Sequence, residues 1–133
     1  MTFIKKVKGK VISGVGKGKF YVLKKPYFSL FKSLLNAKPY PGTLNVVISD
    51  GQLTIEELPH RFKPSEYGEI RYTLGEFSGI KIVVLRPCKS VHPKNVFEIV
   101  APVRLRDALN IMDGENIEFE IIVSKRKIGS STS

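Results

Sequence analysis

The chain has 133 residues, with 22 Lys and Arg against 12 Asp and Glu, which gives a formal net charge of +10. Apolar residues make up 42% and charged residues 26%, a composition typical of one globular domain rather than a disordered chain. A single cysteine excludes an intrachain disulfide and a zinc site built on several cysteines, and fits a cytoplasmic location. No apolar run approaches the roughly 18 residues of a membrane span, and the Lys-rich residues 1–10 do not resemble a signal peptide.

The positive charge is concentrated in the N-terminal third of the chain. Residues 1–40 contain ten lysines and no acidic residue, whereas twelve basic residues balance twelve acidic ones in residues 41–133. A basic field confined to one region favours polyanions, such as nucleic acid, an anionic membrane surface or the phosphates of a nucleotide. Composition alone ranks nucleic acid first among these partners.

The N-terminal third is predicted to contain two strands and one helix. Apolar residues and glycine alternate with lysines over residues 7–11, which predicts a half-buried strand, and a second strand is expected over residues 19–23. Pro26 suits the first turn of a helix that continues over residues 27–35. Asn36 is expected to end this helix in a left-handed conformation.

Short strands dominate the rest of the sequence. A hairpin joined through Gly75 and a short helix over residues 103–109 are predicted between turns at Asp50-Gly51 and Asp113-Gly114. Six or seven short strands with two short helices favour a mainly β fold, a small closed β-barrel, over a βαβ sheet. We expect one domain over residues 1–124 and a flexible basic, serine-rich tail over residues 125–133. Strands are expected over residues 43–48, 69–74, 80–85, 96–100 and 117–121.

A glycine-rich segment, residues 13–19, joins the first two predicted strands. Its three glycines at alternate positions allow backbone N–H groups to approach a ligand, and Lys17 and Lys19 add positive charge. The segment lacks the Gly-Lys-Ser/Thr of a Walker A loop and the spacing of the dinucleotide fingerprint. It therefore indicates either a phosphate cradle or a plain hairpin turn.

The segment Pro39-Tyr-Pro-Gly-Thr-Leu-Asn45 places two neutral oxygen-bearing side chains close together. Thr43 and Asn45 are two residues apart, so they share one face of an extended strand. Neutral oxygens suit a hard cation already balanced by phosphates, such as Mg²⁺ on a nucleotide. The alternative is turn chemistry, in which the prolines fix the backbone and Thr43 bonds to the turn.

Charged residues in two later segments are further candidates for ligand contacts. Glu98 interrupts an apolar strand, so its carboxylate faces either a ligand or solvent. Arg104 and Arg106 begin the second helix, where a helix N-terminus and two positive charges attract anions. The alternative is a pair of surface arginines beside Asp107.

Taken together and in this order, the segments resemble the archaeal CTP-dependent riboflavin kinases. The resemblance begins at residues 9–21, continues through residues 26–31 and 39–45, and ends with residues 98–106 and 109–114. The stretch at 39–45 is the most specific of these segments. The resemblance implies a six-stranded cradle-loop β-barrel that transfers a phosphoryl group from CTP to the ribityl 5′-hydroxyl of riboflavin, giving FMN and CDP.

The resemblance also implies roles for individual residues, carried over by matching position. Thr43 and Asn45 hold Mg²⁺, and Ser90 and Glu98 bind the flavin. The residues implied to contact the CTP or CDP nucleotide are Val15, Gly16, Lys17, Gly18, Lys19 and Phe20 on one side and Val103, Arg104, Leu105 and Arg106 on the other.

Glu98 is the candidate for a catalytic base, and that role is a hypothesis. Phosphoryl transfer depends on positioning and charge neutralisation more than on covalent chemistry. Two alternatives stay open, a non-enzymatic nucleic-acid-binding barrel and a related barrel kinase with another nucleotide or acceptor. We expect a cytoplasmic monomer without membrane contact.

Overall fold

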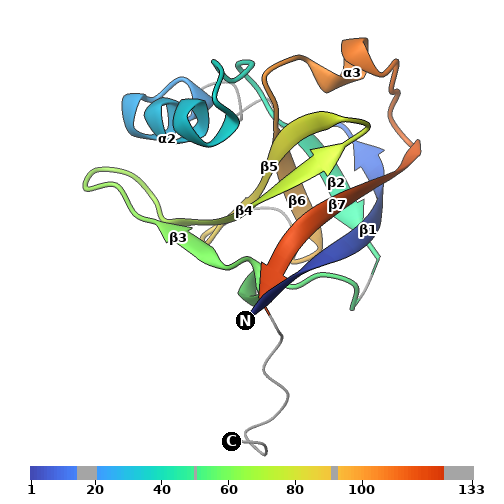
Figure 1. Cartoon of the computed structure of the whole chain (residues 1–133), viewed down its shortest axis with the longest axis horizontal. Coiled ribbons are helices and arrows are strands. Elements are labelled where there is room, and N and C mark those ends of the chain that lie inside the picture. The colour runs from blue at the N-terminus through green and yellow to red at the C-terminus, as the bar shows by residue number, and fades with distance from the viewer. Residues whose placement is uncertain (15–20, 50, 91–92, 125–133) are drawn as a thin grey trace, which may run out of the picture.

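The computed structural model describes residues 1–14, 21–49, 51–90 and 93–124. The described elements alternate between strands and short helical segments along the chain (Figure 1). In chain order they are β1 (Thr2–Ile12), α2 (Lys25–Leu35), β2 (Leu44–Ile48), the 3₁₀ turn η1 (Ile55–Glu57), β3 (His60–Phe62), β4 (Ile70–Phe77), β5 (Ile80–Pro87), β6 (Val96–Val100), α3 (Leu105–Ala108) and β7 (Asn116–Ser124).

Six strands close into an antiparallel barrel. They follow the order β4-β5-β6-β2-β1-β7, and β7 pairs back onto β4. The short strand β3 is an addition to the barrel, because it pairs with residues 70–72 of β4 while β7 pairs with Gly75 and Glu76. The predicted mainly β fold with a closed six-stranded barrel is therefore confirmed, whereas β3 and η1 were not predicted.

The pairing of β4 with β7, which closes the barrel, depends on Gly75, and the predicted turn at Gly75 is wrong. The hairpin of β4 and β5 is present, but its turn is Ser78-Gly79, with φ angles of 50° and 80°, rather than Gly75. Gly75 lies inside β4, opposite Ile121 of β7. A Cβ atom there would lie 2.3 Å from the carbonyl oxygen of Glu120, so the close approach of the two strands requires glycine.

Two apolar clusters pack on the two faces of the barrel wall. Inside the barrel, alternate residues such as Val7 of β1 and Phe119 of β7 form the larger cluster. Outside, the predicted amphipathic helix α2 lies beside β5 and buries Phe31 against Val83 and Leu85 (Figure 1). The outward face of β5 and β6 is therefore covered on the side of α2.

Residues 21–23 form a helical turn rather than the predicted strand. Tyr21 and Val22 have helical geometry, and the N–H of Lys24 donates to the carbonyl of Tyr21. Val22 is fully buried in the cluster around α2, so tertiary packing determines the conformation of this segment.

Asn36 ends α2 at φ 55°, as the sequence predicted. No helix among the described residues is long and apolar enough to cross a membrane.

Candidate active site

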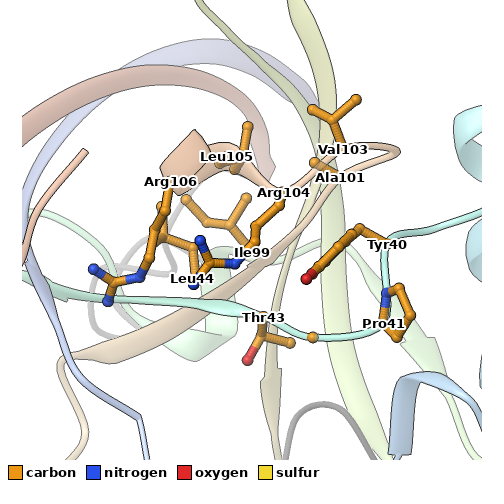
Figure 2. A pocket seen from close by; sticks show the side chains of 11 residues that line it. Tyr40, Pro41, Thr43, Leu44, Ile99, Ala101, Val103, Arg104, Leu105 and Arg106 are labelled. Atoms are coloured by element: carbon orange, nitrogen blue, oxygen red, sulfur yellow. The ribbon is translucent and has the colours of Figure 1, made fainter. Parts of the chain in front are cut away.

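A cleft of about 190 Å³ lies at the end of the barrel near α3 (Figure 2). One wall consists of residues 40–44, which lead into β2, and the other of residues 103–106, which lead into α3. The N–H of Tyr40 donates to the carbonyl of Ala101 at 2.8 Å and ties the two walls together. Two motifs far apart in the sequence therefore meet at one cleft.

The two arginines of the cleft are held by carboxylates. Arg104 contacts Asp107 at 2.7 Å, the pairing that the surface-arginine alternative anticipated, yet it also lines the cleft. Figure 2 shows Tyr40 on one wall and Arg104 on the other, both with side chains at the cleft. Arg106 contacts Asp113 at 2.6 Å and donates to the carbonyl of Ile12 at 3.2 Å. The cleft is thus rich in donors that face a polar, solvent-accessible space.

Asp113 connects the Arg106 wall to the end of β1. The Ser13 hydroxyl donates to the Asp113 carboxylate, and the N–H of Gly114 donates to the carbonyl of Val11 at 2.7 Å. The hydrogen bond from Ser13 and the contact with Arg106 hold the pKa of Asp113 below its ordinary value. The end of β1 and Ser13, the first residue of the glycine-rich segment, are therefore held against the arginine wall.

Asn45 has an unusual environment for a buried amide. Its side chain is 7% exposed, and Oδ1 has no hydrogen-bond partner among the described residues. Gly14 packs against it, since a Cβ atom at Gly14 would lie 2.0 Å from Nδ2. A buried acceptor without a donor normally carries a free-energy cost. This orphaned oxygen, with the hydroxyl of Thr43 at the cleft, fits the neutral donor set of a phosphate-bound cation.

Glu98 lies directly beside Asn45, and it is buried rather than solvated. The β2–β6 register pairs Asn45 with Glu98, and the β5–β6 register pairs Leu85 with Glu98. Glu98 is only 6% exposed, and the hydroxyl of Tyr21 donates to its Oε1 at 2.8 Å. The interpretation of Glu98 as an outward, solvated residue is therefore wrong, because the segment around Tyr21 covers this face of the barrel.

A second cavity, of about 220 Å³, adjoins Tyr21. It is lined by Tyr21, Tyr27 and Lys89, among others, and the two tyrosine rings meet edge to face at 5.6 Å. Ser90 follows Lys89 in the turn after β5, half-buried, and its N–H donates to the carbonyl of Pro87 at 3.2 Å. Neither tyrosine was predicted as a site residue, because Tyr21 fell in the strand expected over residues 19–23 and Tyr27 in the helix expected over residues 27–35.

Residues 15–20, which are predicted to contact the nucleotide, lie outside the described residues. Of the lysines on β1, Lys6 and Lys8 lie opposite Glu120 and Glu118 of β7. The outer face of β1 is therefore flanked by negative charge. Within the described ranges, no group of three or more His, Cys, Asp or Glu side chains is arranged to hold a metal ion.

Comparison with known proteins identifies relatives over most of the chain. Residues 11–121 match the family model CTP-dep_RFKase, described as "Domain of unknown function DUF120". The chain is 36% identical to a riboflavin kinase of Pyrobaculum aerophilum over 86% of its own length and 60% of the relative. It is 37% identical to one of Pyrococcus abyssi, over 86% of the chain and 57% of that relative. Against the riboflavin kinase of Sulfolobus acidocaldarius, identity is 33% over 89% of the chain and 82% of the relative.

Several of these relatives are considerably longer than this chain. The chain spans about three-fifths of the length of the riboflavin kinases of Pyrobaculum aerophilum and Pyrococcus abyssi that it matches. The matched segment includes β2, β6 and both walls of the cleft.

Proposed function

Because the chain belongs to the CTP-dependent riboflavin kinase family, we propose that it transfers the γ-phosphoryl group of CTP to the ribityl 5′-hydroxyl of riboflavin. The products are FMN and CDP. The bond between the β,γ-bridging oxygen and the γ-phosphorus breaks, and a bond forms between the riboflavin oxygen and that phosphorus. The hydroxyl proton is lost to solvent or to a base.

The observation that carries this proposal is the juxtaposition of Asn45 and Glu98 on paired strands next to the cleft. Asn45 presents a neutral oxygen that no described residue bonds to, and its neighbour Glu98 presents a buried carboxylate. A kinase needs a place for a metal-bound triphosphate beside a place for a polyhydroxyl acceptor. The two neighbouring residues offer one group suited to each substrate.

We assign the donor side of the reaction to the cleft. Arg104 and Arg106, with residues 15–20, contact CTP, and the arginines supply positive charge to its phosphates. Thr43 and Asn45 are the residues that would hold Mg²⁺, which neutralises triphosphate charge when it is bound. The unsatisfied Oδ1 of Asn45 supports this assignment.

We assign the acceptor side to Glu98 and Ser90. A carboxylate accepts hydrogen bonds from the hydroxyl groups of a ribityl chain, and a serine hydroxyl can donate or accept. The aromatic cavity beside Tyr21 lies on this side of the site, which supports the placement of a flat, aromatic acceptor. The carboxylate of Glu98 is also the candidate general base for the 5′-hydroxyl.

Incubation with riboflavin, Mg²⁺ and either CTP or ATP, followed by chromatographic detection of FMN, tests the proposed function. We expect FMN with CTP and much less with ATP. FMN from ATP alone would make the protein a barrel kinase with another donor, and no FMN from any nucleoside triphosphate would refute the kinase assignment. Duplex DNA binding that weakens steeply with salt, in a chain without kinase activity, would instead support the nucleic-acid alternative.

A further inference from the structure

Tyr21 connects the helical turn after the glycine-rich segment to the carboxylate of Glu98. Its hydroxyl donates to Oε1 of Glu98 at 2.8 Å, and the positive charge of Arg86 also acts on this carboxylate. A carboxylate can accept about four hydrogen bonds, so the single bond from Tyr21 leaves capacity for a ligand. Tyr21 therefore restricts the orientation of the carboxylate without saturating it.

The ring of Tyr21 is itself held in place by neighbouring aromatic residues. It meets Tyr27 edge to face at 5.6 Å, and Tyr27 stacks on Phe31 at 6.5 Å within α2. The hydroxyl of Tyr27 donates to the carbonyl of Gly68. A ring fixed in this way can hold its hydroxyl in one position, and little side-chain entropy is then lost when a ligand binds.

The electrostatic surroundings of Tyr21 keep it in the role of a hydrogen-bond donor. Burial, followed by the charge of Glu98 and the hydrogen bond to it, raises the pKa of Tyr21 well above its ordinary value. The phenol therefore retains its proton throughout the physiological pH range.

We propose that Tyr21 is a positioning residue for the acceptor substrate, holding the Glu98 carboxylate in the orientation that receives the ribityl hydroxyls of riboflavin. Tyr21 also lines the aromatic cavity, so one side chain borders the cavity with its ring and orients Glu98 with its hydroxyl. The inference rests on the proposed function, because it concerns the same acceptor.

The test is Tyr21→Phe, which removes the hydroxyl and keeps the ring. Loss of a hydrogen bond to a charged group predicts that KM for riboflavin rises about tenfold. We expect KM for CTP and the melting temperature to stay close to wild type. Tyr72→Phe is the matched control, because Tyr72 is half-buried in the same cluster and its hydroxyl bonds to no described residue. It should leave KM for riboflavin unchanged.

The outcomes separate this inference from the proposed function. If wild type forms FMN and Tyr21→Phe keeps the same KM for riboflavin, the inference is wrong and the kinase assignment stands. A parallel rise of KM for riboflavin and KM for CTP, or a large fall in melting temperature, would show that the Tyr21 hydroxyl has a structural role. Either result would also overturn the inference.

Riboflavin binding without nucleotide, measured by quenching of flavin fluorescence, gives a second readout. We expect affinity to fall about tenfold in Tyr21→Phe. A wild-type chain that binds riboflavin but forms no FMN would refute the proposed activity. The riboflavin affinities of wild type and Tyr21→Phe would then still test the role of Tyr21. A chain that neither binds nor phosphorylates riboflavin would overturn both proposals.

Discussion

The two ends of the barrel differ in whether their buried polar side chains have hydrogen-bond partners among the described residues. At the end where β1 begins, Glu57 is 3% exposed and is satisfied by Lys5 at 3.2 Å and by the backbone N–H of Thr54 at 2.9 Å. At the end near α3, Asn45 is similarly buried, yet its Oδ1 has no partner among the described residues.

We interpret this difference as one between a structural polar group and one proposed to bind a ligand. The capping box of η1 and the Lys5–Glu57 ion pair close one end of the barrel with internal hydrogen bonds. A native protein rarely leaves a buried acceptor unsatisfied unless another component satisfies it. Substitutions at the two ends should therefore have opposite consequences for stability and activity.

The largest effect is expected when Thr43→Ala and Asn45→Ala are combined. We expect FMN formation at saturating Mg²⁺ and CTP to fall by at least about 100-fold, because charge neutralisation of the triphosphate is impaired. The free energy of unfolding should stay the same or rise, since Asn45→Ala removes a desolvated acceptor that has no donor among the described residues. Steady-state kinetics and urea denaturation measure the two quantities. Unchanged turnover would support the alternative in which residues 39–45 only form a turn.

The next largest effect is expected at the opposite end, for Glu57→Ala. This change leaves Lys5 without its partner and removes the reciprocal cap of η1, so we expect a loss of about 2 kcal/mol in the free energy of unfolding. Activity at 25 °C should remain close to wild type, because Glu57 does not line the cleft. Urea denaturation and the FMN assay provide the measurements. A strong loss of activity without loss of stability would contradict the division between the two ends.

A smaller effect is expected for Gly14→Ala, which probes the packing around Asn45. The new methyl group would meet Nδ2 of Asn45 and displace the amide, so we expect about a tenfold loss of kcat with little change in stability. A kcat equal to that of wild type would show that the position of Asn45 is not critical.

The fold was largely predictable where the local signal and the tertiary packing agree. Pro26, the apolar spacing of α2 and Asn36 mark one helix, and the alternation of apolar residues marks β7. The prediction failed at residues 21–23, because an aromatic and β-branched run resembles a strand while burial against α2 determines a helical turn. It also misplaced the turn at Gly75, since a glycine needed for strand approach looks the same in sequence as a glycine needed for a turn.

The candidate site was predictable as separate motifs but not as an arrangement. Thr43, Asn45 and Glu98 were identified from residue type, whereas the pairing of Asn45 with Glu98 depends on the β2–β6 register. The hydrogen bond from Tyr21 to Glu98 and the ion pair between Lys5 and Glu57 join residues far apart in the chain. Such pairs leave no local pattern. The β1 lysines were unexplained by sequence, and the structure assigns Lys5 to the closed end of the barrel.

The smallest effect is expected for Asp113→Asn, which tests the connection between Arg106 and the end of β1. Ser13 and Arg106 hold the pKa of the Asp113 carboxyl below its ordinary value, so the folded state favours the ionised form. This contribution to stability is complete above the ordinary aspartate pKa of about 3.9 and is lost as the pH falls through the lower pKa of the folded state.

The melting temperature of Asp113→Asn should therefore lie slightly below that of wild type at pH 7. The two values should converge as the pH falls below about 4, where the wild-type carboxyl also becomes neutral. Because the Asp113 side chain is 51% exposed, added salt should reduce the difference at pH 7. A difference that stays constant between pH 7 and pH 3 would show that Asp113 acts through packing rather than charge. In that case the arginine wall would be fixed by the remaining bond from Arg106 to the Ile12 carbonyl.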